Sequence, residues 1–342
     1  MLRTMLLLSW LLLLPLTPSP AADDAWVGQD VFPKRGIPEI SRTNEQGEVI
    51  VLGKIDYFPV PVREEKGDWV KVQVRDVAGW VAKSKVVRVR DGIQYFTERI
   101  QSKDDLAEAY QKRAWLWSMK NEPDIAIQDA TEALRLDPKD VYAYMNRGIA
   151  WSAKKDYDKA IADYNEALRL DPKDALAYNN RGWTYYLCRE YDQAMADYDQ
   201  CLKLDPQNAY ATGNRGLVYA AQKKYPEAVA AFEAAVKLPE YVPYEYAEFL
   251  ASCPEVKYRD GKRAVELAKK AIELKGKDAS ADVFAALAAA YAETGDFEQA
   301  VVEQRTAIDK LKENKYTTAE EMKQAEARLK LYEEKKPYRQ EK

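Results

Sequence analysis

The side chains that most often carry out acid–base, nucleophilic or metal chemistry are scarce in this chain. Its 342 residues include no histidine and three cysteines, Cys188, Cys201 and Cys253. Without histidine the chain cannot form a Ser-His-Asp triad or use a histidine as general base or metal ligand. Carboxylate or cysteine chemistry stays open, but the acids follow solvated helix faces. We therefore expect no enzymatic activity, no cofactor and no metal.

The cysteines are expected to be small, buried side chains. Cys188 should lie near the turn end of one helix and Cys201 well along the next, so their Cα atoms should exceed the limit of about 7 Å for a disulfide. The composition, 47% hydrophobic and 32% charged, indicates a soluble chain of two or more domains. A net charge of −4 argues against non-specific nucleic-acid binding.

Two short sequences recur with a period of 34 residues, Leu-Asp-Pro and Asn-Arg-Gly. A fixed period of this size is typical of stacked copies of one supersecondary unit. The recurrences are Leu136–Pro138, Leu170–Pro172 and Leu204–Pro206, with Asn146–Gly148, Asn180–Gly182 and Asn214–Gly216.

The unit can be interpreted in its copy at 141–174. Tyr144 and Gly148 share one face of a first helix, and Ala160 and Tyr164 share one face of a second. Pro172 ends the second helix. The pattern predicts an antiparallel pair of helices. Gly148 is small where the two helices must approach closely, so a larger side chain there should overpack the contact.

At these residues the unit resembles the tetratricopeptide repeat, whose pattern is aromatic, Gly, aromatic, Ala, aromatic, Ala, Pro. In the copy at 175–208 the pattern is matched by Tyr178, Gly182, Tyr185, Ala194, Tyr198 and Pro206, with Cys201 where Ala is usual. Four copies fit the resemblance, and we number them one to four: 107–140, 141–174, 175–208 and 209–242.

Two of the four copies depart from the pattern. In copy one, Ala114 replaces the glycine, Pro123 replaces the aromatic residue of the turn and Ala130 replaces the aromatic residue of the second helix. Copy four ends with Pro239 one place early. The resemblance implies an all-α superhelical array of helix pairs.

The resemblance also implies a concave groove lined by the first helices, in which a protein or peptide would bind. Aromatic rings would supply contact area and amides would pair with a peptide backbone; the alternative is that the Asn residues bond along their own helices. The lysines that grip a carboxyl terminus are not matched. The predicted groove residues are Trp115, Tyr142, Met145, Asn146, Ile149, Asn179, Asn180, Trp183, Tyr186, Tyr210, Asn214 and Leu217.

Arginines recur beside these asparagines, at Arg147, Arg181 and Arg215. We expect them to pair with carboxylates on second helices, such as Asp163 and Asp197, rather than with a ligand.

Residues 1–21 resemble a secretory signal. Arg3 precedes an apolar run, and small residues follow it, which predicts cleavage after Ala21 or Ala22. The apolar run is far shorter than the roughly 20 residues of a membrane span. We therefore expect an exported protein, periplasmic or secreted.

Residues 25–90 have a period of two instead of the helical period. Glu65–Asp68 predicts a hairpin turn between two strands, and about five short strands predict a small β-barrel. The ending Gly79–Ala82 resembles bacterial Src-homology-3-like domains, which implies binding of a peptide or cell-wall glycopeptide; a structural cap is the alternative. Trp69 and Trp80 are expected in the core.

The remaining segments extend the array at both ends. Residues 91–104 are expected to be a lone second helix that stacks on copy one and holds the barrel in a fixed relation to the repeats. Residues 243–278 and 281–314 predict two further helix pairs, copies five and six, the former with a long connection at 254–260. Residues 317–335, which begin with a capping box, predict a terminal capping helix. The tail at 335–342 is expected to be disordered.

The fold class predicted is thus a small all-β barrel followed by an all-α repeat array. The function predicted is a non-enzymatic scaffold that binds a protein or peptide in the groove. The alternative is a cell-envelope module that binds peptidoglycan or a peptide through the barrel, with the repeats as a spacer.

Overall fold

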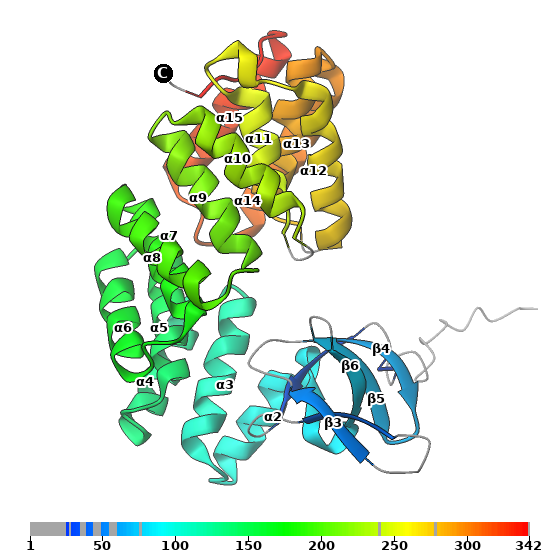
Figure 1. The fold of residues 1–342 in the computed structure, drawn as a ribbon, viewed down its shortest axis with the longest axis vertical. Helices are drawn as coiled ribbons and strands as arrows, with labels where there is room; N and C mark the ends of the chain where they lie inside the picture. The colour runs from blue at the N-terminus through cyan, green and yellow to red at the C-terminus, as the bar shows by residue number, and fades with distance from the viewer. Residues whose placement is uncertain are drawn as a thin grey trace, which may run out of the picture. The chain divides into compact units, whose positions relative to one another are not determined.

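The computed structural model describes residues 25–26, 29–34, 39–43, 49–54, 60–74, 77–238, 241–276 and 279–340. The predicted signal and its cleavage position at Ala21 or Ala22 lie outside these residues. The chain divides into two compact units, residues 1–102 and 103–342. Figure 1 shows a β-rich first unit and a helical second unit, which confirms the predicted fold class.

The first unit is a seven-stranded antiparallel sheet with strand order β3-β2-β6-β5-β4-β1-β7. A 3₁₀ turn at Lys83–Lys85 precedes the last strand. The strands are β1 (Asp30–Pro33), β2 (Glu39–Thr43), β3 (Val49–Lys54), β4 (Val60–Lys66), β5 (Trp69–Val74), β6 (Val77–Ala82) and β7 (Val86–Arg88).

The predicted hairpin turn joins β4 to β5, with Lys66 opposite Trp69 and Gly67 at φ +55°. Val70 and Val72 are fully buried. Because side chains alternate along a strand, Trp69 must face outward, and it is 46% exposed. The prediction of a core position was wrong for Trp69.

Helix α2 (Val89–Gln101) corresponds to the predicted bridging helix and belongs to the first unit. Phe96 packs edge-on against Phe32 of β1, with ring centroids 6.2 Å apart. Arg99 donates to the backbone carbonyl of Lys34 at 2.9 Å. Stacking of this segment on copy one stays a prediction.

The second unit is a succession of antiparallel helix pairs closed by one further helix (Figure 1). Within the described residues, none of the helices combines the length and apolar character needed to cross a bilayer. The pairs are α3 (Leu106–Met119) with α4 (Pro123–Leu136), α5 (Val141–Ala153) with α6 (Tyr157–Leu170), α7 (Ala175–Leu187) with α8 (Tyr191–Leu204), α9 (Ala209–Ala221) with α10 (Tyr225–Val236), α11 (Tyr244–Ser252) with α12 (Gly261–Lys275) and α13 (Ala281–Thr294) with α14 (Phe297–Glu313), followed by α15 (Ala319–Glu333).

The period of 34 residues extends to the backbone of the turns. Copies one to four each place one left-handed residue, with φ between +56° and +62°, in the turn between first and second helix. The amides of this turn bond to the last carbonyls of the first helix, which the helix itself leaves without partners. These residues are Asn121, Lys155, Arg189 and Lys223.

The repeated glycines lie where a ring crosses the first helix. A Cβ atom at Gly148 would lie 2.8 Å from a carbon of Tyr164, and Gly182 and Gly216 meet Tyr198 and Phe232 in the same way. The predicted close approach is therefore confirmed.

The arginines that follow the asparagines pair as predicted in copies two and three. Arg147 donates two hydrogen bonds to Asp163, at 2.8 and 2.7 Å, and Arg181 does the same to Asp197. Arg215 also pairs with a carboxylate on a second helix, but that carboxylate is Asp199 of the preceding copy, 3.4 Å away, because Ala231 stands at the position equivalent to Asp163 and Asp197.

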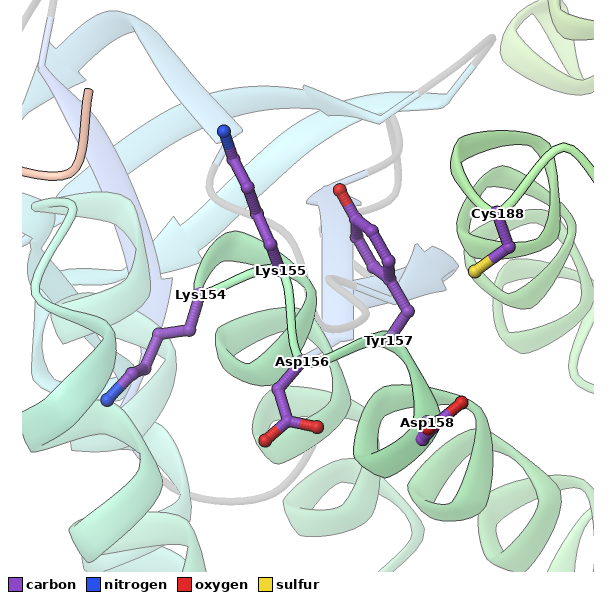
Figure 2. A pocket seen from close by; sticks show the side chains of 6 residues that line it. All are labelled: Lys154, Lys155, Asp156, Tyr157, Asp158 and Cys188. Atoms are coloured by element: carbon purple, nitrogen blue, oxygen red, sulfur yellow. The ribbon is translucent and has the colours of Figure 1, made fainter. Parts of the chain in front are cut away.

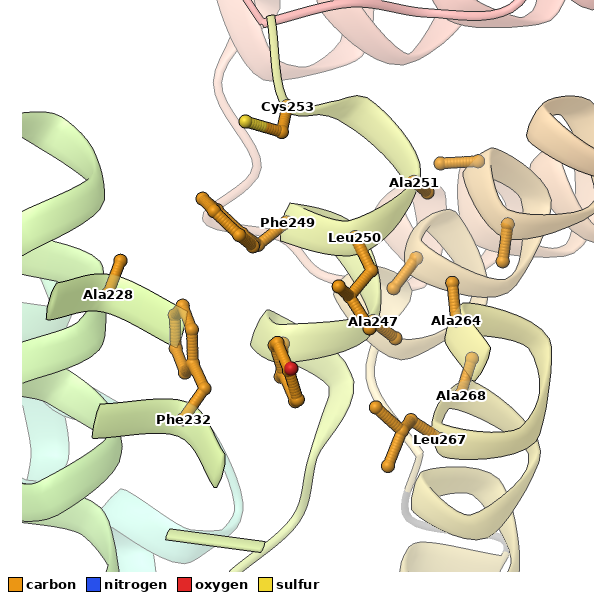
Figure 3. Packing of buried hydrophobic residues seen from close by; sticks show 14 of the residues in the cluster. Ala228, Phe232, Ala247, Phe249, Leu250, Ala251, Cys253, Ala264, Leu267 and Ala268 are labelled. Carbon is orange, nitrogen blue, oxygen red and sulfur yellow. The ribbon is translucent and has the colours of Figure 1, made fainter. Parts of the chain in front are cut away.

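Copies four and five share one buried cluster, although copy five departs from the repeat pattern (Figure 3). The ring of Phe232 stacks on Tyr246 at 5.1 Å between centroids and meets Phe249 at 5.6 Å. Leu250 and Leu267 bring α11 and α12 into the same cluster. The array is thus continuous through its degenerate copy.

Candidate functional site

Successive first helices of the array contact one another, so their outward side chains form one surface, the first-helix surface. Tyr142 and Tyr210 lie at the same place in copies two and four and are 40% and 45% exposed. The other predicted residues that keep part of their surface accessible are Ile149, Asn179, Asn180, Trp183, Tyr186, Asn214 and Leu217.

Three predicted groove residues lie in the packing between helices instead. Trp115 is 8% exposed, Met145 is 2% exposed and Asn146 is fully buried. Met145 packs with Tyr164 and Leu168 in the core of copy two. Packing between neighbouring helices therefore buries these three predicted groove positions. A partner cannot contact them in this conformation.

The repeated asparagines connect neighbouring copies. The amide of Asn146 donates to the carbonyl oxygen of Gln111 at 2.9 Å, and Asn214 donates to Asn179 at 3.3 Å. Both bonds join residues 35 positions apart. Sequence reasoning expected either partner binding or bonds within one helix, and the structure adds this third arrangement.

Aromatic side chains gather on copy three. Trp183 and Tyr186 of α7 stack with ring centroids 5.3 Å apart, and Tyr191 of α8 lies 6.0 Å from Tyr186. Burial, with smaller contributions from Tyr191 and the carboxylates Glu248 and Glu245, raises the pKa of Tyr186 to about 12. Tyr186 therefore stays a neutral hydrogen-bonding group at physiological pH.

Glu245 and Glu248, whose carboxylates contribute to the raised pKa of Tyr186, lie on α11, and both α7 and α11 contact the intervening first helix α9. Arg328 of α15 lies 2.8 Å from a carboxylate oxygen of Glu248. Asp282 of α13 contributes to the raised pKa of Glu245, and Glu248 contributes to the raised pKa of Asp282. Charged side chains of the first helices α11 and α13 and of the capping helix α15 thus form one electrostatic cluster. This cluster could not be predicted from the repeat pattern, because its members are far apart along the chain.

Glu245 is the most perturbed carboxylate of this cluster. Burial, reinforced by Asp282 and Glu248, raises its pKa to about 7, and its Oε2 atom is enclosed without a hydrogen-bond donor. Such a carboxylate can exchange a proton near neutral pH. Among the described residues, no three Asp, Glu or Cys side chains gather closely enough to hold a metal ion.

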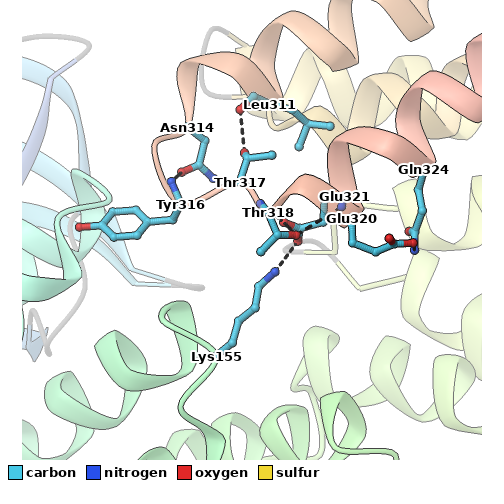
Figure 4. A network of polar contacts seen from close by, with 9 residues as sticks. All are labelled: Lys155, Leu311, Asn314, Tyr316, Thr317, Thr318, Glu320, Glu321 and Gln324. Carbon is cyan, nitrogen blue, oxygen red and sulfur yellow. Dashed lines mark hydrogen bonds and ion pairs between the residues drawn. The ribbon is translucent and has the colours of Figure 1, made fainter.

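The curvature brings the connection between α14 and α15 back to copies one and two. Asn121 donates to Asn314 at 2.7 Å. Lys155 donates to Glu321 at 2.8 Å (Figure 4). Lys315 also pairs with Glu122. A capping box begins α15, one position later than predicted, at Thr318 and Glu321 rather than at Thr317 and Glu320. Glu321 serves both this cap and the contact with Lys155. We refer to these contacts as the closing contacts.

A pocket of about 430 Å³ lies beside the closing contacts, between the turns of copies two and three (Figure 2). Its lining includes Lys155, Tyr157 and Cys188. All three cysteines are free, as predicted, but Cys188 is only partly buried. Burial and nearby carboxylates raise the pKa of the Cys188 thiol, which opposes the thiolate form needed of a nucleophile.

Comparison with known proteins supports the repeat assignment. Tetratricopeptide repeat profiles match residues 141–174 and 175–208, and another profile of the same name matches 209–241. These ranges coincide with predicted copies two to four within one residue. No curated protein matched the chain.

Solved structures share the fold at low identity. A tetratricopeptide repeat protein of Parabacteroides merdae is 17% identical, with a TM-score of 0.54 over 72% of this chain and 92% of that one. A chain of the APC/C hetero-tetramer Cut9–Hcn1 is 16% identical, with a TM-score of 0.52 over 72% of this chain and 52% of that one. MamA is 24% identical, with a TM-score of 0.40 over 44% of this chain and 89% of that one.

The profiles, the helix pairs and the repeated glycine–ring contacts agree. The chain carries tetratricopeptide repeats, preceded by a β-rich N-terminal unit.

Proposed function

We propose that the protein is an exported, non-enzymatic scaffold that binds a protein or extended peptide on the first-helix surface. The observation that carries this proposal is the pair of tyrosines, Tyr142 and Tyr210, exposed two copies apart on α5 and α9. Large rings that remain accessible on two first helices offer contact area to a partner at little cost in conformational entropy. Partly exposed amides, such as Asn180, lie between them and can pair with a peptide backbone.

The chemistry of this surface favours binding over catalysis. The electrostatic neighbours of the enclosed Glu245 include the carboxylates Asp282 and Glu248, and Arg328 is engaged by Glu248. Cys188 has a raised pKa. The absence of histidine from the sequence removes the group that most often completes such sites.

The test is affinity capture from the envelope fraction of the producing cell, with the wild-type chain and a Tyr142→Ala/Tyr210→Ala double variant as baits. A matched control is Val302→Ala, which removes an exposed apolar side chain from the second helix α14. We expect the same partner with wild type and control and its loss with the double variant. A partner retained equally by all three baits would contradict the proposal.

Binding of cell-wall glycopeptide by the first unit is the second candidate. It is favoured by Trp69, which the alternation of β5 directs outward and which is 46% exposed. Sedimentation of the full chain with purified cell wall, compared with Trp69→Ala, tests it. Export is tested separately, by sequencing the amino terminus of the mature protein for cleavage after Ala21 or Ala22.

A further inference from the structure

Residues 335–340 pack against the array, whereas disorder was predicted for 335–342. The amides of Lys335 and Lys336 bond to the carbonyls of Tyr332 and Leu331, and Lys335 has φ +56°, which ends the helix in a Schellman turn. Pro337 prevents further helix. The chain then runs without regular structure as far as Gln340. We call residues 337–340 the tail segment.

The tail segment binds the C-terminal end of α11 as an extended peptide would. The amide of Gln340 donates to the carbonyl of Ser252 at 3.0 Å. Arg339 donates to the carbonyl of Ala251 at 3.2 Å, and its other terminal nitrogen lies 2.5 Å from Oε2 of Glu293. A cation is favoured here, because the carbonyl end of a helix carries partial negative charge.

An aromatic contact precedes the arginine. The guanidinium of Arg328 lies 4.0 Å from the ring centroid of Tyr338. The same ring packs against the cluster that contains Tyr332 and Ala292. Two successive side chains of the tail segment, an aromatic ring and then an arginine, are therefore bound by the array.

This acceptor site exists because copy five lacks the turn of copies one to four. In copy two the amides of Lys154, Lys155 and Asp156 bond to the last carbonyls of α5. In copy five the chain leaves α11 at Cys253 in an extended conformation and returns through the long connection at 254–260. The carbonyls of Ala251 and Ser252 therefore receive no amide from a tight turn, and they accept hydrogen bonds from the tail segment.

The long connection also builds the acidic part of the site. Arg259 donates to the carbonyl of Cys253 at 3.0 Å and to Oε1 of Glu293 at 3.0 Å. This fixes the Glu293 carboxylate, largely buried, with its second oxygen directed at Arg339. Removal of Arg339 would leave that oxygen with no cation.

We infer that the ends of α11 and α13 form a docking site for an extended segment in which an aromatic residue precedes arginine. The chain's own tail segment fills this site, and a partner segment with the same aromatic–arginine pair competes with it. The inference extends the proposed function, since it names the chemistry of one partner class, but it uses a site apart from Tyr142 and Tyr210. The tail segment is then an intramolecular competitor, which lowers the apparent affinity of the site for a partner segment.

The test uses a chain that lacks residues 336–342 and a fluorescein-labelled peptide of sequence KPYRQEK, which reproduces those residues. Fluorescence polarisation should show saturable binding to the truncated chain and binding at least tenfold weaker to the full chain, where the site is filled. A peptide with Arg339→Ala, or a scrambled peptide, should bind at least tenfold more weakly. Glu293→Gln in the truncated chain should give a similar loss.

Controls separate the docking site from the proposed groove. Glu255→Gln, in the same connection, removes a carboxylate that pairs only locally with Lys257 and should leave peptide binding unchanged. The Tyr142→Ala/Tyr210→Ala change in the truncated chain should also leave it unchanged, so that failure of one proposal is distinguishable from failure of the other. If truncation prevents folding, the full chain with Arg339→Ala serves as receptor.

Two results would overturn the inference. The first is a folded receptor, with wild-type circular dichroism, that does not bind the peptide or binds the scrambled peptide equally well. The second is a full-length dimer that becomes monomeric on truncation, because the tail segment would then belong to a second copy.

Discussion

Substitution of Gly148 by alanine tests how the repeats pack. In an isolated helix, alanine is more favourable than glycine by about 1 kcal/mol. In copy two we expect the opposite sign, because the new Cβ would lie 2.8 Å from Cε1 of Tyr164 and 3.0 Å from Cζ. Carbon atoms normally approach to about 3.5–4.0 Å.

The magnitude follows from how little the ring can move. Tyr164 is 2% exposed and packs among Met145, Ala160 and Ala177, so displacement of the ring disturbs the contact between copies two and three. Overpacking of this kind costs about 1–3 kcal/mol. After the gain in helix propensity, the net loss in free energy of unfolding should be about 1 kcal/mol.

The assay is urea unfolding of the full chain followed by far-ultraviolet circular dichroism, in a double-mutant cycle with Tyr164→Leu. In the Leu background the ring is gone, so Gly148→Ala should become neutral or stabilising. Copy one supplies a matched control, since Ala114 already stands at the equivalent position and Ala130 replaces the ring. Ala114→Gly should therefore destabilise. A Gly148→Ala chain more stable than wild type would refute the reasoning.

Three further predictions concern charged groups. Lys155→Glu should lower the thermal midpoint only slightly, since surface ion pairs contribute about 0–1 kcal/mol, and the loss should be smaller at high salt than at low salt. Asp163→Asn should lower the free energy of unfolding by about 2 kcal/mol, because it breaks a two-bond, partly buried pair, whereas Asp199→Asn, at a longer and exposed contact, should change it by less than about 0.5 kcal/mol. Burial raises the pKa of Glu245 from 4.5 to about 7, so the free energy of unfolding of the wild type falls as pH rises through this range. In urea titrations, Glu245→Gln should therefore leave the free energy of unfolding unchanged at pH 4 and increase it at pH 8. An equal effect of the substitution at both pH values would contradict this.

The repeat array could be predicted because its determinants are local and periodic. The glycine–ring pair lies within one copy, 16 residues apart, as does the pairing of Arg147 with Asp163. In two copies, where one member of a contacting pair departs from the repeat pattern, the other changes in residue type or in partner. Ala114 replaces glycine in the copy where Ala130 replaces the ring, and Arg215 changes partner in the copy where Ala231 replaces Asp.

The exposed surface was harder to predict than the core. A helical pattern gives the direction of a side chain relative to its own helix, but exposure depends on the rotation between neighbouring copies. Asn146 was assigned to the groove on its own helix, whereas the neighbouring copy brings the carbonyl of Gln111 within 2.9 Å and buries it. In the first unit the error was simpler, since the alternation with Val70 and Val72 already directs Trp69 outward.

Contacts between distant segments had no signal in the sequence pattern. The long connection of copy five was predicted from the sequence. Its effect on the hydrogen bonding of the last carbonyls of α11 could be seen only in the backbone structure. A tight turn satisfies the last carbonyls of a first helix with its own amides, as in copy two. When the turn opens, those carbonyls must find other donors, and here Arg339 and Gln340 supply them. An irregular connection within a regular array therefore marks the place where the array can accept another segment of chain, whether from its own terminus or from a partner.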